Sequence, residues 1–279
     1  MTESVATRFV GDLRQSTQSS VARRSLLFMG AVIVAETSVL FGEVSLGVSI
    51  HAFLLMLILW MILYFEDVSR IYEALLLVPL LRILNLGTGD IGISPYLWLA
   101  IVYLLLVGSS WFVMRSSDTS WREVGVIPDI SLRWAIFVTL GVGFGVGLGL
   151  VQWGFELETP PAEPTLVNTI LAVLVIGLLV GFVEELIFRG LLQPWFAEVT
   201  TTWFAIIVVS VLFGFMHSVW MEPMNIVFAG SVGLLLGWFY ARTRNFWFIW
   251  VVHAWINITA YAILPYFLAE QPSIIWQFL

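Results

Sequence analysis

Long apolar stretches separated by short polar segments dominate the sequence. A helix needs about 20 mostly apolar residues to cross a bilayer, and nine of these stretches reach or approach that length. They run through residues 25–42, 46–65, 71–86, 95–114, 134–154, 166–190, 202–220, 224–241 and 246–265. The third is short and contains Arg82, so the count is eight to nine. The pattern predicts an all-α, polytopic bundle of about nine transmembrane helices.

Composition supports the same class. Of the 279 residues, 60% are hydrophobic and 11% are charged, whereas about 25% of a soluble domain is charged. A soluble globular protein is therefore excluded. The net charge of -7 argues against a nucleic-acid partner. The absence of cysteine excludes disulfides, thiol catalysis and cysteine-ligated metals.

The arginines give an orientation. With the N-terminus inside and nine spans, eleven of the twelve arginines fall on the cytoplasmic side, where positive charge collects. These eleven are Arg8, Arg14, Arg23, Arg24, Arg70, Arg115, Arg122, Arg133, Arg189, Arg242 and Arg244. We therefore expect a multi-pass integral membrane protein of the plasma membrane, with residues 1–24 as a mobile cytoplasmic tail and residues 266–279 as a C-terminal tail.

Several other features of the spans have mainly structural interpretations. The glycines at 141, 145 and 149 recur at i, i+4, a spacing that lets membrane helices pack closely. Glu36 has no assigned partner, and Glu73 with Arg82 is interpreted as an interhelical ion pair or as interfacial. His51 lies near the start of the second span and is interpreted as an interfacial histidine.

The sixth span carries two adjacent glutamates and an arginine. Neighbouring helical side chains point about 100° apart, so Glu185 shares a face with Arg189 at i, i+4 and Glu184 does not. Glu185 and Arg189 are therefore predicted to form a pair. Glu184 has no local cation, and a carboxylate in such a low-dielectric setting suits general acid–base chemistry.

Two later spans add further polar groups at helical spacing. Phe213 and His217 share a face of the seventh span, and His253 and Asn257 share a face of the ninth. Ionisable groups inside a membrane are costly and mark candidate sites. Their convergence with the glutamates predicts one site.

Depth along the spans agrees with this prediction. At 1.5 Å per residue, His253 and Asn257 lie roughly 12 and 18 Å from the inner end of their helix. Glu184 lies roughly 15 Å deep if its helix continues to about Gln193 and ends before Pro194. The groups are then expected to meet in a cavity open toward the cytoplasm.

The three motifs, Glu-Glu-x-x-x-Arg at 184–189, Phe-x-x-x-His at 213–217 and His-x-x-x-Asn at 253–257, resemble those of the CPBP family. That family comprises type II CAAX prenyl proteases and bacteriocin-processing or self-immunity relatives, sometimes called the ABI domain. The resemblance covers residues 165–265 as a protease core. Residues 25–160 form an N-terminal transmembrane region that it does not cover.

The resemblance implies an intramembrane endopeptidase. The resemblance implies that Glu184 activates the attacking water as general base and that His217 binds or polarises that water. His253 and Asn257 stabilise the oxyanion, while Glu185 and Arg189, with Phe213, support the site. The implied partners are membrane lipids and a peptide or protein substrate, with or without a lipid group.

The sequence alone leaves metal dependence and two other functions open. No cofactor is certain, but Glu184, His217 and His253 offer the donors of a zinc site. One alternative is a non-catalytic membrane scaffold or bacteriocin-immunity protein. The other is a proton-coupled transporter, against which the lack of a visible inverted repeat counts.

Overall fold

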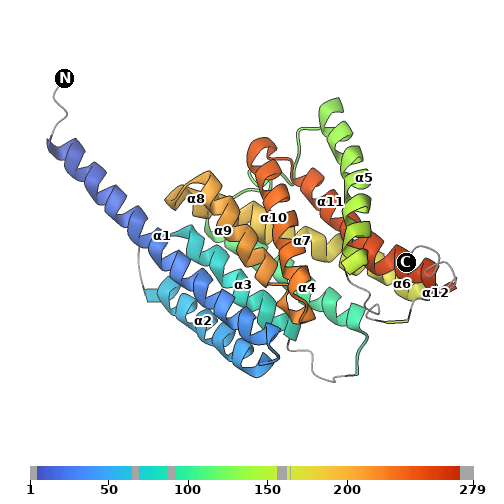
Figure 1. Cartoon of the computed structure of the whole chain (residues 1–279). Helices are drawn as coiled ribbons and strands as arrows, with labels where there is room; N and C mark the ends of the chain where they lie inside the picture. Colours follow the sequence, from blue (N-terminus) through green and yellow to red (C-terminus); the bar gives the residue numbers. More distant parts are fainter. Residues whose placement is uncertain (1–4, 65–68, 87–91, 156–161, 164, 271–279) are drawn as a thin grey trace.

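A computed structural model describes residues 5–64, 69–86, 92–155, 162–163 and 165–270, and the described elements are helices (Figure 1). The first five are α1 (Val5–Leu40), α2 (Val44–Tyr64), α3 (Arg70–Leu86), α4 (Pro95–Ser116) and α5 (Leu132–Phe155). A long sixth helix consists of α6 (Leu166–Ala172), η1 (Val173–Val180), α7 (Gly181–Glu185), η2 (Leu186–Leu192) and α8 (Gln193–Val199). The remainder is α9 (Thr202–Phe215), η3 (Ser218–Trp220), α10 (Pro223–Thr243), α11 (Phe246–Ile258), η4 (Thr259–Ile263) and α12 (Leu264–Glu270).

The chain is a polytopic, all-α membrane protein, as predicted. All nine expected stretches are helical, and seven of the described helices are long and apolar enough to cross a bilayer. The other two expected spans lie in α1 and α3. Helix α3 has 17 residues and its apolar side chains are mostly buried among neighbouring helices. Helix α1 begins at Val5, so most of the expected tail is helical, and Figure 1 shows this end projecting beyond the other helices.

The sixth helix is longer than the sequence predicts. It was expected to end near Gln193, but it passes Pro194 and ends at Val199. Proline disrupts a helix because it lacks an N–H and its ring meets the carbonyl four residues earlier. Here the π-helical turns of η2 immediately precede it, and their wider hydrogen bonding makes room for the ring.

Glycines bring α5 into close contact with α11. A Cβ atom on Gly145 would lie 2.5 Å from the carbonyl oxygen of Val252, and one on Gly149 would lie 2.8 Å from that of Ile256. A Cβ on Gly147, by contrast, would meet nothing within 4 Å. The packing role expected for the i, i+4 glycines is confirmed, and the helix that they support is the one that carries His253.

A buried ionic cluster joins the first three helices. Arg82 Nε and Nη2 donate to Glu36 Oε1 and Oε2 over 2.7 and 2.6 Å, and His51 Nε2 lies 2.9 Å from Glu36 Oε1. The expected Glu73–Arg82 pair is therefore wrong: nine residues along one helix separate them by roughly 13 Å. Glu73 accepts from Ser116 and Ser117 instead. His51, expected near an interface, has a side chain that is fully buried among the helices.

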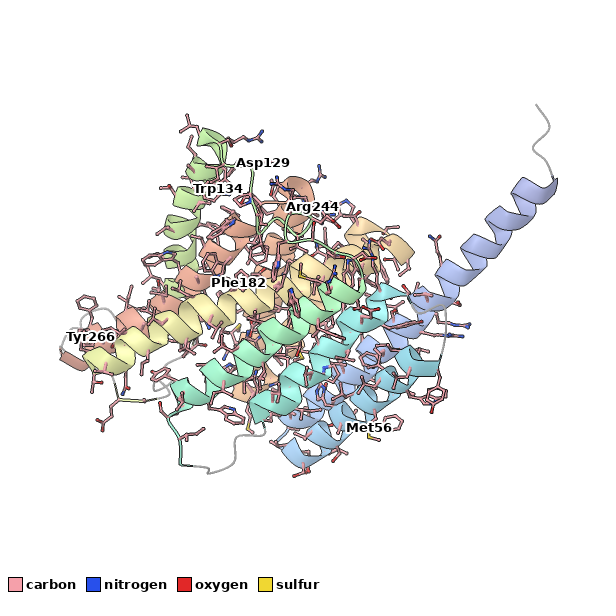
Figure 2. The ribbon with its side chains drawn as sticks, turned by 180° about the vertical axis from the view of Figure 1, so that it is seen from behind. Met56, Asp129, Trp134, Phe182, Arg244 and Tyr266 are labelled. Carbon is pink, nitrogen blue, oxygen red and sulfur yellow. The ribbon has the colours of Figure 1, made fainter. Side chains whose placement is uncertain are left out.

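The two ends of the bundle differ in charge. Figure 2 shows Asp129 and Arg244 near one another at one end, and these residues line a cavity there together with Arg122, Arg133 and Arg242. We call this end the arginine-rich face and the opposite end the arginine-poor face. Between the two faces, apolar side chains such as Met56 point outward, as expected for a surface in contact with lipid.

Candidate active site

One cavity of about 580 Å³ brings the predicted site together. Glu184, Phe213, His217, His253 and Asn257 all line it. They come from α7, α9, the turn before η3, and α11. The rest of the wall is mostly apolar or aromatic and includes Leu81, Ile93, Trp98, Leu99, Ile176, Val180, Phe188, Met216, Val219, Trp220 and Tyr261. A cavity of this size and lining accommodates a small ligand or a short peptide segment.

Glu184 presents its carboxylate to this cavity from the short α7 segment between two π-helical turns. Its Oε1 accepts a hydrogen bond from the Tyr103 hydroxyl over 2.7 Å. Its Oε2 lies 3.8 Å from Nε2 of His253. The side chain is mostly buried but touches the cavity, so it is available to a bound molecule and is shielded from bulk water.

Glu185 has different surroundings from its neighbour. Its Oε1 accepts from Nδ1 of His253 over 2.7 Å and from Nη1 of Arg189 over 3.2 Å, and all three side chains are buried. The predicted Glu185–Arg189 pair is therefore present. The Arg189 guanidinium also lies 4.0 Å from the centre of the Phe213 ring, a cation–π contact that fixes α9 against the sixth helix.

His217 follows the end of α9 and is held by the last turn of that helix. Its Nδ1 lies 2.9 Å from the Phe213 carbonyl oxygen, and the two rings meet edge to face with centroids 4.9 Å apart. A carbonyl only accepts hydrogen bonds, so Nδ1 carries the proton. In the neutral imidazole, Nε2 then keeps its lone pair.

Asn257 is oriented by the π-helical part of the sixth helix. Its Nδ2 donates to the carbonyl oxygen of Ile176, in η1, over 3.1 Å. An amide nitrogen carries two hydrogens, so one N–H remains for another acceptor. Wider helical turns of this kind are often found at functional sites because they alter which backbone groups are available.

The sequence interpretation missed Tyr103 and Asn85, two polar residues of the cavity wall. Tyr103 contacts Glu184 directly, and Asn85 Nδ2 lies 3.3 Å from the Tyr103 hydroxyl. A tyrosine in an apolar helix is easily taken for an interfacial aromatic residue. Tyr103, however, lies near the middle of its span, well away from the interfaces where such tyrosines collect, and that was the available signal.

The cavity opens on the arginine-poor face. Its exposed lining residues are Gly92, Ile93 and Pro95 at the start of α4 and Val219 in the turn after α9. Residues deeper in the wall, such as Phe188, are fully buried. The expectation of a cavity open toward the arginine-rich side does not agree with this lining, because the polar groups are reached from the opposite helix ends.

The three groups that the sequence offers as zinc donors, Glu184, His217 and His253, are not gathered around one point. In the part of the chain that the structure describes, no three imidazole or carboxylate groups are placed to share one metal ion, and this includes Glu184, His217 and His253. Nδ1 of each histidine is engaged, by the Phe213 carbonyl and by Glu185 respectively, and Nε2 of each ring remains as a donor atom.

Comparison with known proteins gives two matches. Residues 166–259 match the family model described as "Type II CAAX prenyl endopeptidase Rce1-like". The chain is also 24% identical over 200 residues, 67% of this chain and 81% of the relative, to the "Putative membrane peptidase YdiL" of Bacillus subtilis (strain 168). No solved structure matches the chain. The matched segment contains all three motifs that line the cavity.

Proposed function

We propose that this chain belongs to the Rce1-like family of intramembrane endopeptidases and hydrolyses peptide bonds with a water molecule activated by Glu184. The observation that carries the proposal is the meeting of Glu184, His217, His253 and Asn257 in one cavity. They come from three separate helical segments, and each has its orientation fixed by a hydrogen bond or by a charged neighbour.

Glu184 and His217 are suited to bind the attacking water together. Both line the same cavity. With its proton on Nδ1, His217 accepts a hydrogen bond at Nε2, and Glu184 accepts at its carboxylate. A water that donates one hydrogen to each turns its oxygen lone pair toward the substrate carbonyl. This positioning is what general-base catalysis requires.

His253 and Asn257 are suited to stabilise the negative oxygen that develops on the attacked carbonyl. Asn257 has an N–H left after its bond to Ile176. His253 lies between Glu184 and Glu185, and these two carboxylates compensate the positive charge of its protonated form. Protonated His253 donates from Nε2. Each oxyanion donor in a preorganised site contributes about 3 kcal/mol to lowering the barrier.

The proton balance closes within the site. As the water oxygen forms its bond to the carbonyl carbon, one water proton passes to Glu184. The carbon–nitrogen bond then breaks, and Glu184 returns this proton to the leaving amine. The second water hydrogen stays on the new carboxyl group, so the products are one new C-terminus and one new N-terminus.

The shape of the cavity indicates an apolar substrate segment. Its walls carry Trp98, Leu99 and Trp220, and its mouth lies at the arginine-poor face. If the arginine-rich face is cytoplasmic, as positive charge in short loops favours, the substrate segment enters from the opposite side or from within the membrane. A peptide with apolar side chains, with or without a lipid group, fits this route.

The test uses the purified protein and three internally quenched fluorescent probes. These are a farnesylated CAAX peptide, the same peptide without the lipid, and an apolar peptide from a membrane span. We expect the wild-type protein to cleave at least one at an internal bond, as identified by mass spectrometry of the products. Glu184→Ala should release no product while unfolding at the wild-type temperature.

Glu73→Gln is the matched control, because Glu73 is another carboxylate of the bundle and, within the described residues, its hydrogen bonds are to Ser116 and Ser117. This variant should cleave at the wild-type rate. Cleavage by Glu184→Ala, or cleavage of none of the three probes by the wild-type protein, would contradict the proposal. The first result would favour a role that does not depend on this carboxylate.

A further inference from the structure

The matched segment begins at residue 166, yet part of the cavity wall comes from earlier helices. Arg82 and Asn85 on α3 and Tyr103 on α4 line the cavity together with the family motifs. Arg82 and Tyr103 are buried, and each contacts a residue of the site or one beside it. These contacts fall into two groups, one at Glu184 and one at His217.

The first group fixes the Glu184 carboxylate. The Tyr103 hydroxyl donates to Oε1 over 2.7 Å and accepts from Asn85 Nδ2 over 3.3 Å. Because the hydroxyl has a single hydrogen, the Asn85 bond keeps it directed at Glu184. Oε2 is thereby left as the oxygen that faces His253. Tyr103 therefore selects which carboxylate oxygen receives the proton of the water.

The second group holds the turn that carries His217. Arg82 Nη2 donates to the carbonyl oxygen of Met216, and the Ser218 hydroxyl donates to Glu36 Oε2. The residues on both sides of His217 are thus tied to the same Arg82–Glu36 pair. Glu36 is fully buried and its two oxygens accept four hydrogen bonds, including the one from His51.

Burial makes these contacts well defined. Glu36, His51 and Ser218 are 0% exposed and Arg82 is 2% exposed. A charged cluster that is buried away from water is costly unless its members satisfy one another. Apolar residues of similar volume would pack α1–α3 together at lower cost. The polar cluster also forms hydrogen bonds to the turn around His217. Apolar residues in its place could not form these bonds.

We propose that the N-terminal helices position the catalytic groups. In this account Tyr103 aligns the Glu184 carboxylate, and the Glu36–Arg82–Ser218 cluster aligns His217 through the backbone on either side of it. The inference rests on the proposed function, since it concerns the same water-activating pair. In this account α1–α4 anchor the chain in the membrane and also position Glu184 and His217.

The first test removes only the hydroxyl of Tyr103. Tyr103→Phe keeps the ring and should lower kcat by about 10- to 100-fold, as expected for a lost hydrogen bond to a charged group, with KM and unfolding temperature unchanged. Tyr96→Phe makes the same chemical change on α4, where the ring packs in a separate cluster with Ala172 and Ile176. This control should keep the wild-type kcat.

The second test loosens the turn at His217. Ser218→Ala should lower kcat with little change in KM. Glu36→Gln should lower kcat and also the unfolding temperature, because it leaves the buried Arg82 without its carboxylate. The matched control is Ser110→Ala, because Ser110 is also a fully buried serine but lies on α4, away from the turn. This variant should keep the wild-type kcat. A readout independent of substrate is the rate at which diethyl pyrocarbonate modifies each histidine. In Ser218→Ala the rate at His217 should rise several-fold, and the rate at His253 should stay the same.

Combining variants separates positioning from a general structural role. If Tyr103 acts through Glu184, Tyr103→Phe has no further effect on the residual rate of Glu184→Gln. Likewise, Ser218→Ala has no further effect in His217→Asn. Additive losses, or wild-type kcat in both Tyr103→Phe and Ser218→Ala, would overturn the inference. If instead Glu184→Gln itself retains activity, the proposed function fails, and the modification rate of His217 alone decides whether the cluster holds the turn.

Discussion

Glu184 and Glu185 are adjacent in the chain but lie in different surroundings. Glu184 faces the cavity and Tyr103, whereas Glu185 is enclosed by Arg189 and His253. The helical angle between neighbours was enough to predict this division from the sequence. It implies that the same conservative change has different consequences at the two positions.

We expect Glu185→Gln to destabilise the protein and Glu184→Gln to leave its stability nearly unchanged. Losing the Glu185 charge leaves Arg189 buried without a compensating carboxylate, at a cost of about 3 kcal/mol or more. Thermal unfolding of both purified variants, read by circular dichroism, measures the difference. Equal unfolding temperatures would show that Glu185 does not hold this ion pair together.

Sequence reasoning could not find every residue of the site. The motif residues stand out because they recur at i, i+4 in apolar helices. The partners of Glu36, by contrast, come from three other parts of the chain, and no spacing rule links Glu36 to Arg82 or to Ser218. Tyr103 was missed for the same reason, since its contact with Glu184 joins two helices that are distant in sequence.

At the level of elements, the sixth helix and α11 together determine the geometry of the site. The wider turns of η1 and η2 flank α7 and place Glu184, and the carbonyl of Ile176 in η1 orients Asn257. Apolar periodicity predicted this helix but not its π-helical turns, because i→i+5 bonding has no clear sequence signature. The end of the helix was misplaced for that reason.

The close packing of α5 against α11 should be sensitive to single methyl groups. We expect Gly145→Ala to displace α11, because the new Cβ would lie 2.5 Å from the Val252 carbonyl oxygen. Overpacking of this kind costs about 1–3 kcal/mol, and the resulting shift of His253 should also reduce cleavage. Unfolding temperature and kcat are the measurements.

Gly147→Ala is the control for this change, since its Cβ would meet nothing within 4 Å. It should be neutral or slightly stabilising, because alanine is the better helix former by up to about 1 kcal/mol. If Gly145→Ala and Gly147→Ala behave alike, the contact between α5 and α11 does not control the site.

At the scale of the whole molecule, the mouth of the cavity and the arginines lie at opposite faces. The mouth includes Ile93 and Val219, and the other face includes Arg122, Arg133 and Arg244. The distribution of arginines could be counted from the sequence. The direction of the cavity could not, because it depends on how far each helix end projects and on which side chains leave space between them.

The orientation can be measured directly, since the chain contains no cysteine. We expect Ser94→Cys, near the mouth, to react with a membrane-impermeant maleimide on intact cells, and Asp129→Cys to react only after permeabilisation. Both positions are exposed. The reverse pattern would place the arginine-rich face outside and the cavity mouth in the cytoplasm.

The claim on which the account depends is that Glu184 activates the water. The most direct measurement is the single-turnover cleavage rate of Glu184→Gln, a variant that keeps the size and hydrogen-bonding shape of the side chain but removes its basicity. With folding confirmed by unfolding temperature, we predict a rate lower than wild type by about 10²- to 10⁴-fold, the usual contribution of a general base. A rate within a few-fold of wild type would contradict the account.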